Sequence, residues 1–301
     1  MMFKYLLLAL IPALVYARIK LKIEAGKTEA DTSVEYSGSN IEIISDTEQE
    51  SFGIKDRALK EACRAYVGVK PTDVYLKSPT PWNDVYRTWN WPQVQRTLKP
   101  VRSRILGIHT KPIIISTREM INTSRYKAKY NAAISHSIEE TVSNSWSIGK
   151  ELTVGQEIEY GVSFPGGGTL GGKTSLSFAG SWGNETTKSS SYTMGSSSSV
   201  EVELSPGQAV VASLSATRGT LDIEIDYEAH LTGMVFANYY GKFDGHHFWA
   251  FPVRQVLRAG GLSQYINSTE KISIGFYTIN ALRGFGQDVE KLIYYRHKKF
   301  H

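Results

Sequence analysis

The chain lacks the residues that staple many small secreted proteins, because its 301 residues include a single cysteine, Cys63. One cysteine excludes an internal disulfide, so stability must come from packing. Beyond the N-terminal stretch, no uninterrupted apolar run approaches the roughly 20 residues of a membrane-spanning helix. The mature product is therefore expected to be soluble when released.

The sequence also lacks the common signatures of catalysis. It contains no G-x-S-x-G elbow, no cysteine paired with a suitable histidine and no recognisable pair of catalytic carboxylates. His246 and His247 are adjacent and on a strand would point to opposite faces, which disfavours a shared metal ion. We expect no enzyme activity and no metal or other cofactor.

Residues 1–17 are typical of a secretory signal peptide. Lys4 precedes an apolar run from Tyr5 to Val15, and a small-residue cleavage site ends at Ala17. The alternative is a buried N-terminal strand or helix. Secretion agrees with three Asn-x-Ser/Thr sequons, which are the glycosylation candidates Asn122, Asn184 and Asn267.

The formal net charge is +5 and the isoelectric point is near 9.0. A basic secreted protein is attracted weakly to anionic lipid heads or acidic glycans, whereas nucleic acid is not an expected partner outside the cell. The densest basic run, Lys291–His301, is interpreted as a solvated terminus.

Apolar residues at helical spacing predict one helix at about residues 54–67, before Gly68 and Pro71. Cys63 falls among these apolar residues. This placement favours a buried core thiol over a reactive group or an intermolecular bridge.

An aromatic block follows the predicted helix. Trp82, Tyr86 and Trp89 stand at i, i+4 and i+7, so one face of a short helix could present all three, with Trp91 close by. The block is either a small aromatic core or a surface that recognises a sugar or a lipid head group.

The most informative pattern is a strict alternation from Thr141 to Phe164. Odd positions are Thr, Ser, Gly or Glu, and even positions are mostly apolar, which predicts a long two-faced β-strand. Strands in globular proteins usually have about 5 or 6 residues, whereas a tilted strand needs roughly 9 to 11 to cross a bilayer.

A second alternating strand follows a glycine-rich turn at residues 165–172, so the unit at 146–182 is predicted to be a hairpin. One face is apolar and the other is polar, as in the repeating element of a transmembrane β-barrel. The expected membrane-inserting face comprises Ile148, Leu152, Val154, Ile158, Tyr160, Val162, Phe164, Leu170, Leu176, Phe178 and Trp182. The expected pore-lumen face comprises Glu151, Glu157, Glu159, Ser163, Ser175 and Ser177.

Residues 167–174 also match the phosphate-binding loop G-x-x-x-x-G-K-[ST]. That loop requires a following helix, because the amides of the helix N-terminus hold the phosphate. The alternation from Ser175 onward predicts a strand instead, so we reject a nucleotide site.

Residues from about 108 to 234 are rich in Ser, Thr, Gly and β-branched types and show almost no helical period. They predict an elongated antiparallel β domain. The expected organisation is an N-terminal α+β region at 18–107, the β module at 108–234, and a C-terminal segment at 235–301 that packs back on the N-terminal region.

The order of these features resembles the aerolysin-like β-pore-forming proteins. The resemblance rests on the amphipathic strand, the tip at residues 164–166, the second strand ending at 181–183, the Ser/Thr-rich return, and the segments 200–208 and 225–233. The blocks Asp73–Trp82 and Gly245–Trp249 are similar to the spherulin-like proteins and the insect follicular-epithelium yolk proteins.

The resemblance implies a mainly β fold with a smaller α+β part, built on an elongated antiparallel β module of aerolysin type with an insertion hairpin. It implies a secreted protein that forms homo-oligomers on a lipid membrane, with a glycan or protein receptor as a further partner. The alternative is a non-lytic secreted structural or storage protein, such as a yolk or matrix protein, that keeps the fold without inserting. The glutamates of the lumen face predict a water-filled pore that mildly prefers cations.

Overall fold

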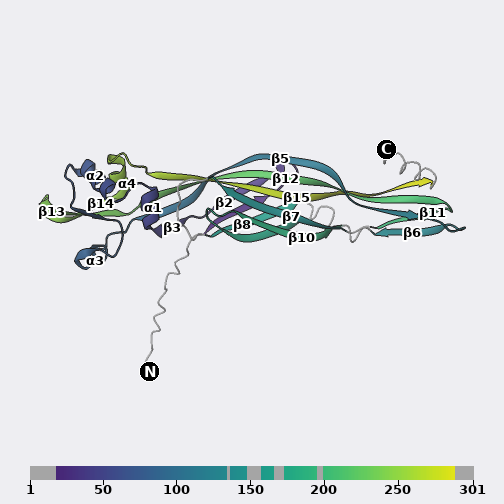
Figure 1. Ribbon diagram of the computed structural model, residues 1–301, viewed down its shortest axis with the longest axis horizontal. Helices are drawn as coiled ribbons and strands as arrows, with labels where there is room; N and C mark the ends of the chain where they lie inside the picture. The colour runs from purple at the N-terminus through teal and green to yellow at the C-terminus, as the bar shows by residue number, and fades with distance from the viewer. Residues whose placement is uncertain (1–17, 134–135, 148–156, 166–172, 195–198, 289–301) are drawn as a thin grey trace, which may run out of the picture.

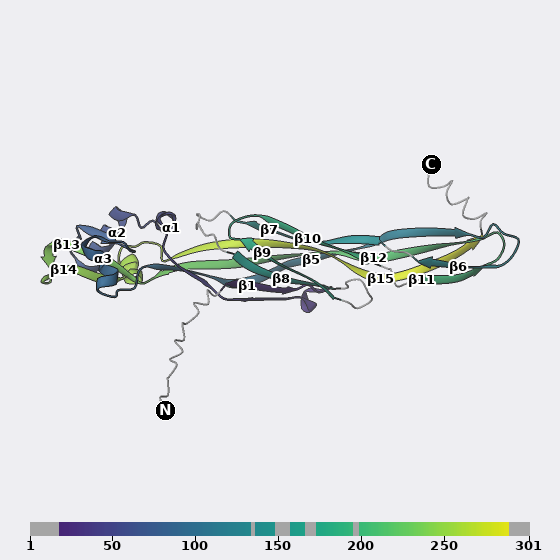
Figure 2. The same cartoon turned by 90° about the horizontal axis from the view of Figure 1, so that it is seen from below.

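The computed structural model describes residues 18–133, 136–147, 157–165, 173–194 and 199–288. The protein is long and narrow, and strands make up most of it (Figures 1 and 2). The expected mainly β fold with an elongated antiparallel module is confirmed. The predicted signal peptide and the basic tail lie outside the described residues.

The largest sheet runs along the molecule and contains six antiparallel strands in the order β10-β7-β15-β12-β5-β3. Its strands are β3 (Asn40–Ile43), β5 (Gln95–Ile121), β7 (His136–Trp146), β10 (Thr186–Met194), β12 (Gln208–Thr232) and β15 (Tyr265–Asp288). The central strand β12 pairs with β15 on one side and with β5 on the other, over nearly its whole length.

A second sheet of four strands has the order β2-β1-β8-β9. Its members are β1 (Ile19–Glu24), β2 (Ser33–Ser37), β8 (Glu157–Pro165) and β9 (Lys173–Ser181), and a 3-10 turn at Glu29–Asp31 lies between β1 and β2. Strands β8 and β9 form an antiparallel hairpin, whereas β1 lies parallel to β8.

The two ends of the molecule carry smaller sheets (Figure 1). At one end β4 (Asp73–Tyr75), β13 (Met234–Phe243) and β14 (His246–Pro252) lie among the helices α1 (Asp46–Ser51), α2 (Asp56–Val67), α3 (Pro81–Thr88) and α4 (Val253–Ala259). At the other end β6 (Ala128–Ala133) pairs with β11 (Ser199–Leu204).

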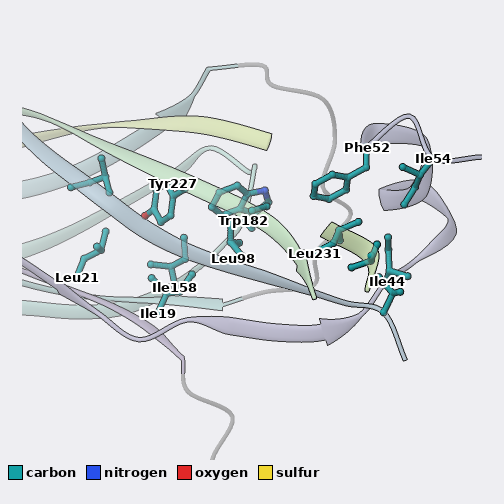
Figure 3. Packing of buried hydrophobic residues seen from close by; sticks show 14 of the residues in the cluster. Ile19, Leu21, Ile44, Phe52, Ile54, Leu98, Ile158, Trp182, Tyr227 and Leu231 are labelled. Carbon is teal, nitrogen blue, oxygen red and sulfur yellow. The ribbon is translucent and has the colours of Figure 1, made fainter. Parts of the chain in front are cut away.

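The main core lies between the four-stranded sheet and the large sheet (Figure 3). Ile19 and Leu21 from β1 and Ile158 from β8 pack in the same cluster as Tyr227 from β12. Each of these strands alternates buried positions with exposed or half-buried ones, because successive side chains point to opposite faces.

The prediction of one continuous strand from Thr141 to Phe164 is wrong. β7 ends at Trp146 and belongs to the large sheet, whereas β8 begins at Glu157 and belongs to the four-stranded sheet. The even positions from Ile138 to Asn144 and from Ile158 to Phe164 are buried because the two sheets face each other. A shared alternation therefore concealed a change of sheet.

The predicted helix at about 54–67 is confirmed as α2, which ends where Gly68 adopts a left-handed backbone with φ of 84°. Cys63 on α2 is fully buried, and burial raises the pKa of its thiol to about 12. Helix α1 was not predicted, although Ser45 and Glu48 form a capping box that the sequence S-x-x-E encodes.

Two of the expected domain boundaries, at 107/108 and at 234/235, fall inside strands. β5 runs through residues 107 and 108, and β13 runs through residues 234 and 235. In addition, β15 from the C-terminal segment pairs with β12 of the β module. The same segment also supplies α4, which packs beside α2, and β13, which pairs with β4. Long strands thus join the helical end to the β module.

A buried ion pair fixes the helical end to the large sheet. Arg96 on β5 has no exposed surface, and its Nε donates to the Glu48 carboxylate on α1 at 2.8 Å. Its Nη1 donates to the backbone oxygen of Asn40 on β3 at 3.2 Å. One side chain therefore joins α1, β3 and β5.

We expect Arg96→Leu to lower the free energy of unfolding by roughly 3–5 kcal/mol, because the Glu48 carboxylate would stay buried without its cation. Urea denaturation measures the change. Arg102→Leu is the matched control, since Arg102 is exposed where it pairs with Asp226, and such pairs contribute about 1 kcal/mol or less. Equal losses in the two variants would contradict this role of Arg96.

Candidate functional site

The hairpin of β8 and β9 has two chemically different faces. Ile158, Tyr160, Val162 and Phe164 are at most 2% exposed and point into the core. On β9, Leu176 and Phe178 stand opposite Val162 and Tyr160 and are partly buried on the same side. These described members of the predicted membrane-inserting face therefore lie on one surface, and that surface is covered.

Aromatic rings fill the base of the hairpin. Trp182, directly after β9, lies 4.4 Å from the Trp146 ring and 4.8 Å from the Tyr227 ring, measured between centroids. Tyr160 stacks on Phe178 at 4.8 Å with the rings nearly parallel. Opposite Ile158, a side chain at Gly180 would meet the Tyr160 ring at 2.9 Å, so glycine allows this close packing.

A buried carboxylate connects the apolar face of the hairpin to the large sheet. Glu270 on β15 accepts hydrogen bonds from Tyr160 at 2.5 Å, Asn144 at 2.6 Å and Tyr227 at 2.7 Å. Burial raises the pKa of Glu270, although these three donors oppose the shift. Tyr160 is the donor that belongs to the hairpin.

A second buried carboxylate lies under β9. Glu140 on β7 accepts a hydrogen bond from Thr174 at 2.6 Å and another from Tyr192 on β10 at 3.1 Å. Burial raises the pKa of Glu140 as well. Sequence reasoning missed Glu140 and Glu270, although Glu140 shares the even register of Val142 and so could have been assigned to the buried face.

The opposite face of the hairpin is polar and faces outward. Glu157, Ser175 and Ser177 are exposed, while Glu159 and Ser163 are half-buried. Glu159 lies 3.2 Å from Lys20 and 3.3 Å from Arg18, and hydrogen bonding to Lys20 and then Arg18 lowers the pKa of the Glu159 carboxyl. The described residues of the predicted lumen face thus share one surface, where Lys20 on β1 and Arg18 directly before it offset the glutamates.

The hairpin is joined to the body through a single strand edge. β8 pairs with β1 from Ile19↔Ile158 to Glu24↔Ser163, and on its other side it pairs with β9. β9 is the last strand of its sheet. Separation of the hairpin therefore requires loss of the β1–β8 ladder and of the packing beneath, but of no other described sheet pairing.

Several predicted residues lie outside the described residues. On the expected membrane-inserting face these are Ile148, Leu152, Val154 and Leu170, and on the lumen face Glu151. The turn at 166–172 within the phosphate-loop match is also outside them. The strand predicted after it is confirmed by β9, which begins at Lys173.

The aromatic block is partly buried and partly exposed, and its role in recognition stays a prediction. Tyr86 is buried with Val85 and Phe236, and its hydroxyl donates to the Tyr75 carbonyl oxygen at 2.8 Å. Trp82 and Trp89 are 45% and 57% exposed. The single helical face expected for Trp82, Tyr86 and Trp89 is wrong, because Trp82 has a left-handed backbone with φ of 62° and Trp89 follows the end of α3.

The exposed rings of this end form a continuous group. Trp89 stacks on Trp91 at 5.8 Å, and Trp91 lies 6.0 Å from Phe236. Trp82 contacts the same Phe236 at 6.0 Å and Phe248 at 5.1 Å. A buried ring thus supports a surface of tryptophans beside β13 and β14.

The three sequons lie in different surroundings. Asn122 is buried, and its side-chain nitrogen donates to the carbonyl oxygens of Tyr126 at 2.8 Å and Leu204 at 2.7 Å. A glycan requires that nitrogen, so the folded structure disfavours Asn122 as a glycosylation site. Asn184 and Asn267 are exposed and stay candidates.

The described part of the chain offers no group of three or more His, Cys, Asp or Glu side chains arranged for a metal ion. The Nδ1 atom of His247 lies within hydrogen-bond distance of the Tyr239 carbonyl oxygen, at 2.7 Å, and the His246 ring packs against Trp249. No helix within the described ranges is long and apolar enough to span a membrane.

Comparison with known proteins finds clear relatives, although no family model matches the sequence. U-megalopygitoxin(8)-Mo12 of Megalopyge opercularis is 36% identical over 91% of this chain and 94% of its own length. U-megalopygitoxin(8)-Mc8 of Megalopyge crispata is 36% identical over 92% of this chain and 96% of its own length.

Among solved structures, parasporin-2, a Bacillus thuringiensis toxin that recognizes cancer cells, has a similar fold with a TM-score of 0.60. The match covers 83% of this chain and 98% of parasporin-2 at 14% sequence identity, so it concerns the fold alone. The closer likeness to spherulin-like and yolk proteins stays a prediction. The chain belongs to the family of the U-megalopygitoxin(8) proteins and has the fold of the aerolysin-like β-pore-forming toxins.

Proposed function

We propose that the protein is a secreted toxin that oligomerises on membranes and inserts the β8–β9 hairpin into a transmembrane β-barrel. The observation that carries the proposal is the hairpin itself, with a covered apolar face, an outward polar face and one strand edge joining it to the body. Relatives named as toxins and a toxin of similar fold support this role.

Physical constraints require the hairpin to act in an assembly. A single hairpin in a bilayer would leave the amides and carbonyls of its edges unpaired in hydrocarbon, at a cost of several kcal/mol each. A closed ring of hairpins pairs every edge. Each subunit would contribute two strands, and insertion would be coupled to assembly of a homo-oligomer.

In this proposal, the apolar face contacts the protein core before assembly and lipid tails after insertion. Each buried Leu, Ile, Phe or Val favours the membrane centre by roughly 0.3–0.6 kcal/mol, a small amount that multiplies around a ring. Before assembly the face must be covered, because an exposed apolar strand pairs and aggregates. Val162 and Phe164, each 1% exposed, satisfy that requirement in the monomer.

The tryptophan surface beside β13 and β14 is the proposed first contact with the membrane or with a glycan receptor. Tryptophan favours the interface between water and lipid because its ring is apolar and its N–H is polar. Trp82 and Trp89 are the exposed members of this surface, whereas Tyr86 belongs to the core beneath it.

A disulfide between the hairpin and β1 tests insertion. Lys20 and Glu159 are register neighbours on adjacent strands, which lie about 4.8 Å apart, so Lys20→Cys with Glu159→Cys can form a bond there. We expect the oxidised protein to release no dye from liposomes or haemoglobin from erythrocytes, and reduction to restore release.

The matched control staples β8 to β9 instead, with Glu159→Cys and Ala179→Cys, and leaves the hairpin free to separate from β1. This oxidised control should permeabilise membranes like the unmodified protein. Full release by the oxidised β1–β8 variant contradicts insertion. Absence of release by the unmodified protein favours the non-lytic structural or storage role.

Charge reversal tests the lumen face. We expect Glu157→Lys with Glu159→Lys to turn a mild preference for cations into a preference for anions, because fixed charges in a narrow pore set ion selectivity. The reversal potential of planar-bilayer currents in a salt gradient measures the change. Glu35→Lys, an exposed glutamate on β2, should leave selectivity unchanged. An unchanged reversal potential in the double variant would refute the lumen assignment.

Replacement of both exposed tryptophans tests the recognition surface. Trp82→Ala with Trp89→Ala should weaken liposome binding in a flotation assay with little change in melting temperature, because both rings are about half exposed. Tyr126→Ala is the control, since Tyr126 is an aromatic side chain with 80% exposure outside this surface. Equal liposome binding by the unmodified protein, the double tryptophan variant and the Tyr126→Ala control would show that Trp82 and Trp89 do not take part in membrane recognition.

A further inference from the structure

Two buried carboxylates contact the hairpin, one through each of its strands. Glu270 is bonded to Tyr160 on β8, and Glu140 is bonded to Thr174 on β9. Both carboxylates have no exposed surface, and both belong to the large sheet. The hairpin therefore carries the donors, and the body of the molecule carries the acceptors.

Neither carboxylate has a cationic partner among the described residues. The titratable groups that face Glu270 are the phenols of Tyr160 from β8 and Tyr227 from β12, beside the amide of Asn144 from β7. Glu140 is faced by the phenol of Tyr192 from β10 and the hydroxyl of Thr174. Hydrogen bonds alone oppose the cost of burying these charges.

The direction of the pH dependence follows from burial. The pKa of both carboxyls is raised from the usual 4.5, mainly by desolvation, so each binds its proton more tightly when the hairpin is docked than when water reaches it. These two carboxyls therefore stabilise the docked state most below pH 4.5. This stabilisation is lost as the pH rises from 4.5 through the raised values.

We propose that Glu140 and Glu270 form a pH-sensitive latch, which holds the hairpin when the two carboxyls are protonated and weakens when they ionise. This inference rests on the proposed departure of the hairpin from the large sheet. When the hairpin leaves, Tyr160 and Thr174 leave with it and water reaches both carboxylates. Ionisation thus favours the released state, and the hairpin separates more readily as the pH rises.

Thiol labelling without any membrane tests the latch. Val162→Cys places a thiol on the covered face, and Ser177→Cys, in a separate protein, places one on the outer face. The ratio of their labelling rates cancels the effect of pH on thiol reactivity and reports how often the hairpin separates. Cys63 does not compete, because it is buried and its thiol pKa is about 12.

We expect the ratio to rise between pH 4 and pH 8, by about tenfold for each unit by which a carboxyl pKa is raised. Glu140→Gln with Glu270→Gln keeps the shape of both side chains without the charge. In that background the ratio should stay at its low-pH value throughout. Glu139→Gln, which removes an exposed carboxylate of β7, should leave the rise intact.

A ratio that does not change with pH, or a rise that persists in the double glutamine variant, overturns the latch. If circular dichroism shows that the double variant is unfolded, each single glutamine variant must remove part of the rise. Dye release is measured separately on the same proteins. A pH-dependent ratio without any release would support the latch and contradict insertion, so the two proposals fail independently.

Discussion

The structure depends on one constraint, which is that the apolar face of the β8–β9 hairpin must be covered by the rest of the protein. Ile158, Tyr160, Val162 and Phe164 cannot face water without inviting aggregation. The large sheet supplies the cover with its own alternating strands, and β1 closes the free edge of β8. The long strands β12 and β15 continue beyond this cover along the molecule, which is why the protein is elongated (Figure 1).

The attachments of the hairpin differ in kind. The β1–β8 ladder is backbone pairing beside exposed ion pairs such as that of Lys20 with Glu159, and such pairs contribute little in water. The covered face holds the hairpin by burial of large rings, including Trp182 against Trp146. By contrast, Arg96 and Glu48 at the helical end form a buried pair with opposite charges. Among the described residues, the ion pairs of the hairpin are exposed, and none is buried like the pair that fixes the helical end.

Sequence alternation predicted the two faces of the hairpin and the strand after Lys173, because period 2 reports which side of a strand is apolar. It did not predict the partners of these strands. Period 2 is unchanged when the chain passes from one sheet to another, so the pattern predicts one strand where β7 and β8 are two. Asn144 interrupts the apolar row and Glu140 directly precedes it. Both are nevertheless buried, because Thr174 bonds to Glu140, and Tyr160 and Glu270 bond to Asn144. Such partners come from distant segments and cannot be found from local pattern.

In the proposed mechanism, the buried polar groups under the hairpin allow one surface to be covered in the folded chain and released on insertion. Replacement of a buried charged network by apolar side chains of similar size often stabilises a protein by about 1–4 kcal/mol. Apolar side chains in place of Glu270 and its three donors would therefore give a tighter interface, and separation of the hairpin would cost more free energy. Carboxylates held only by hydroxyls and an amide satisfy their hydrogen bonds in the docked state and regain water on release. The hydrogen bonds satisfy the buried polar groups in the folded chain. This polar part nevertheless favours the docked hairpin less strongly than an apolar core would.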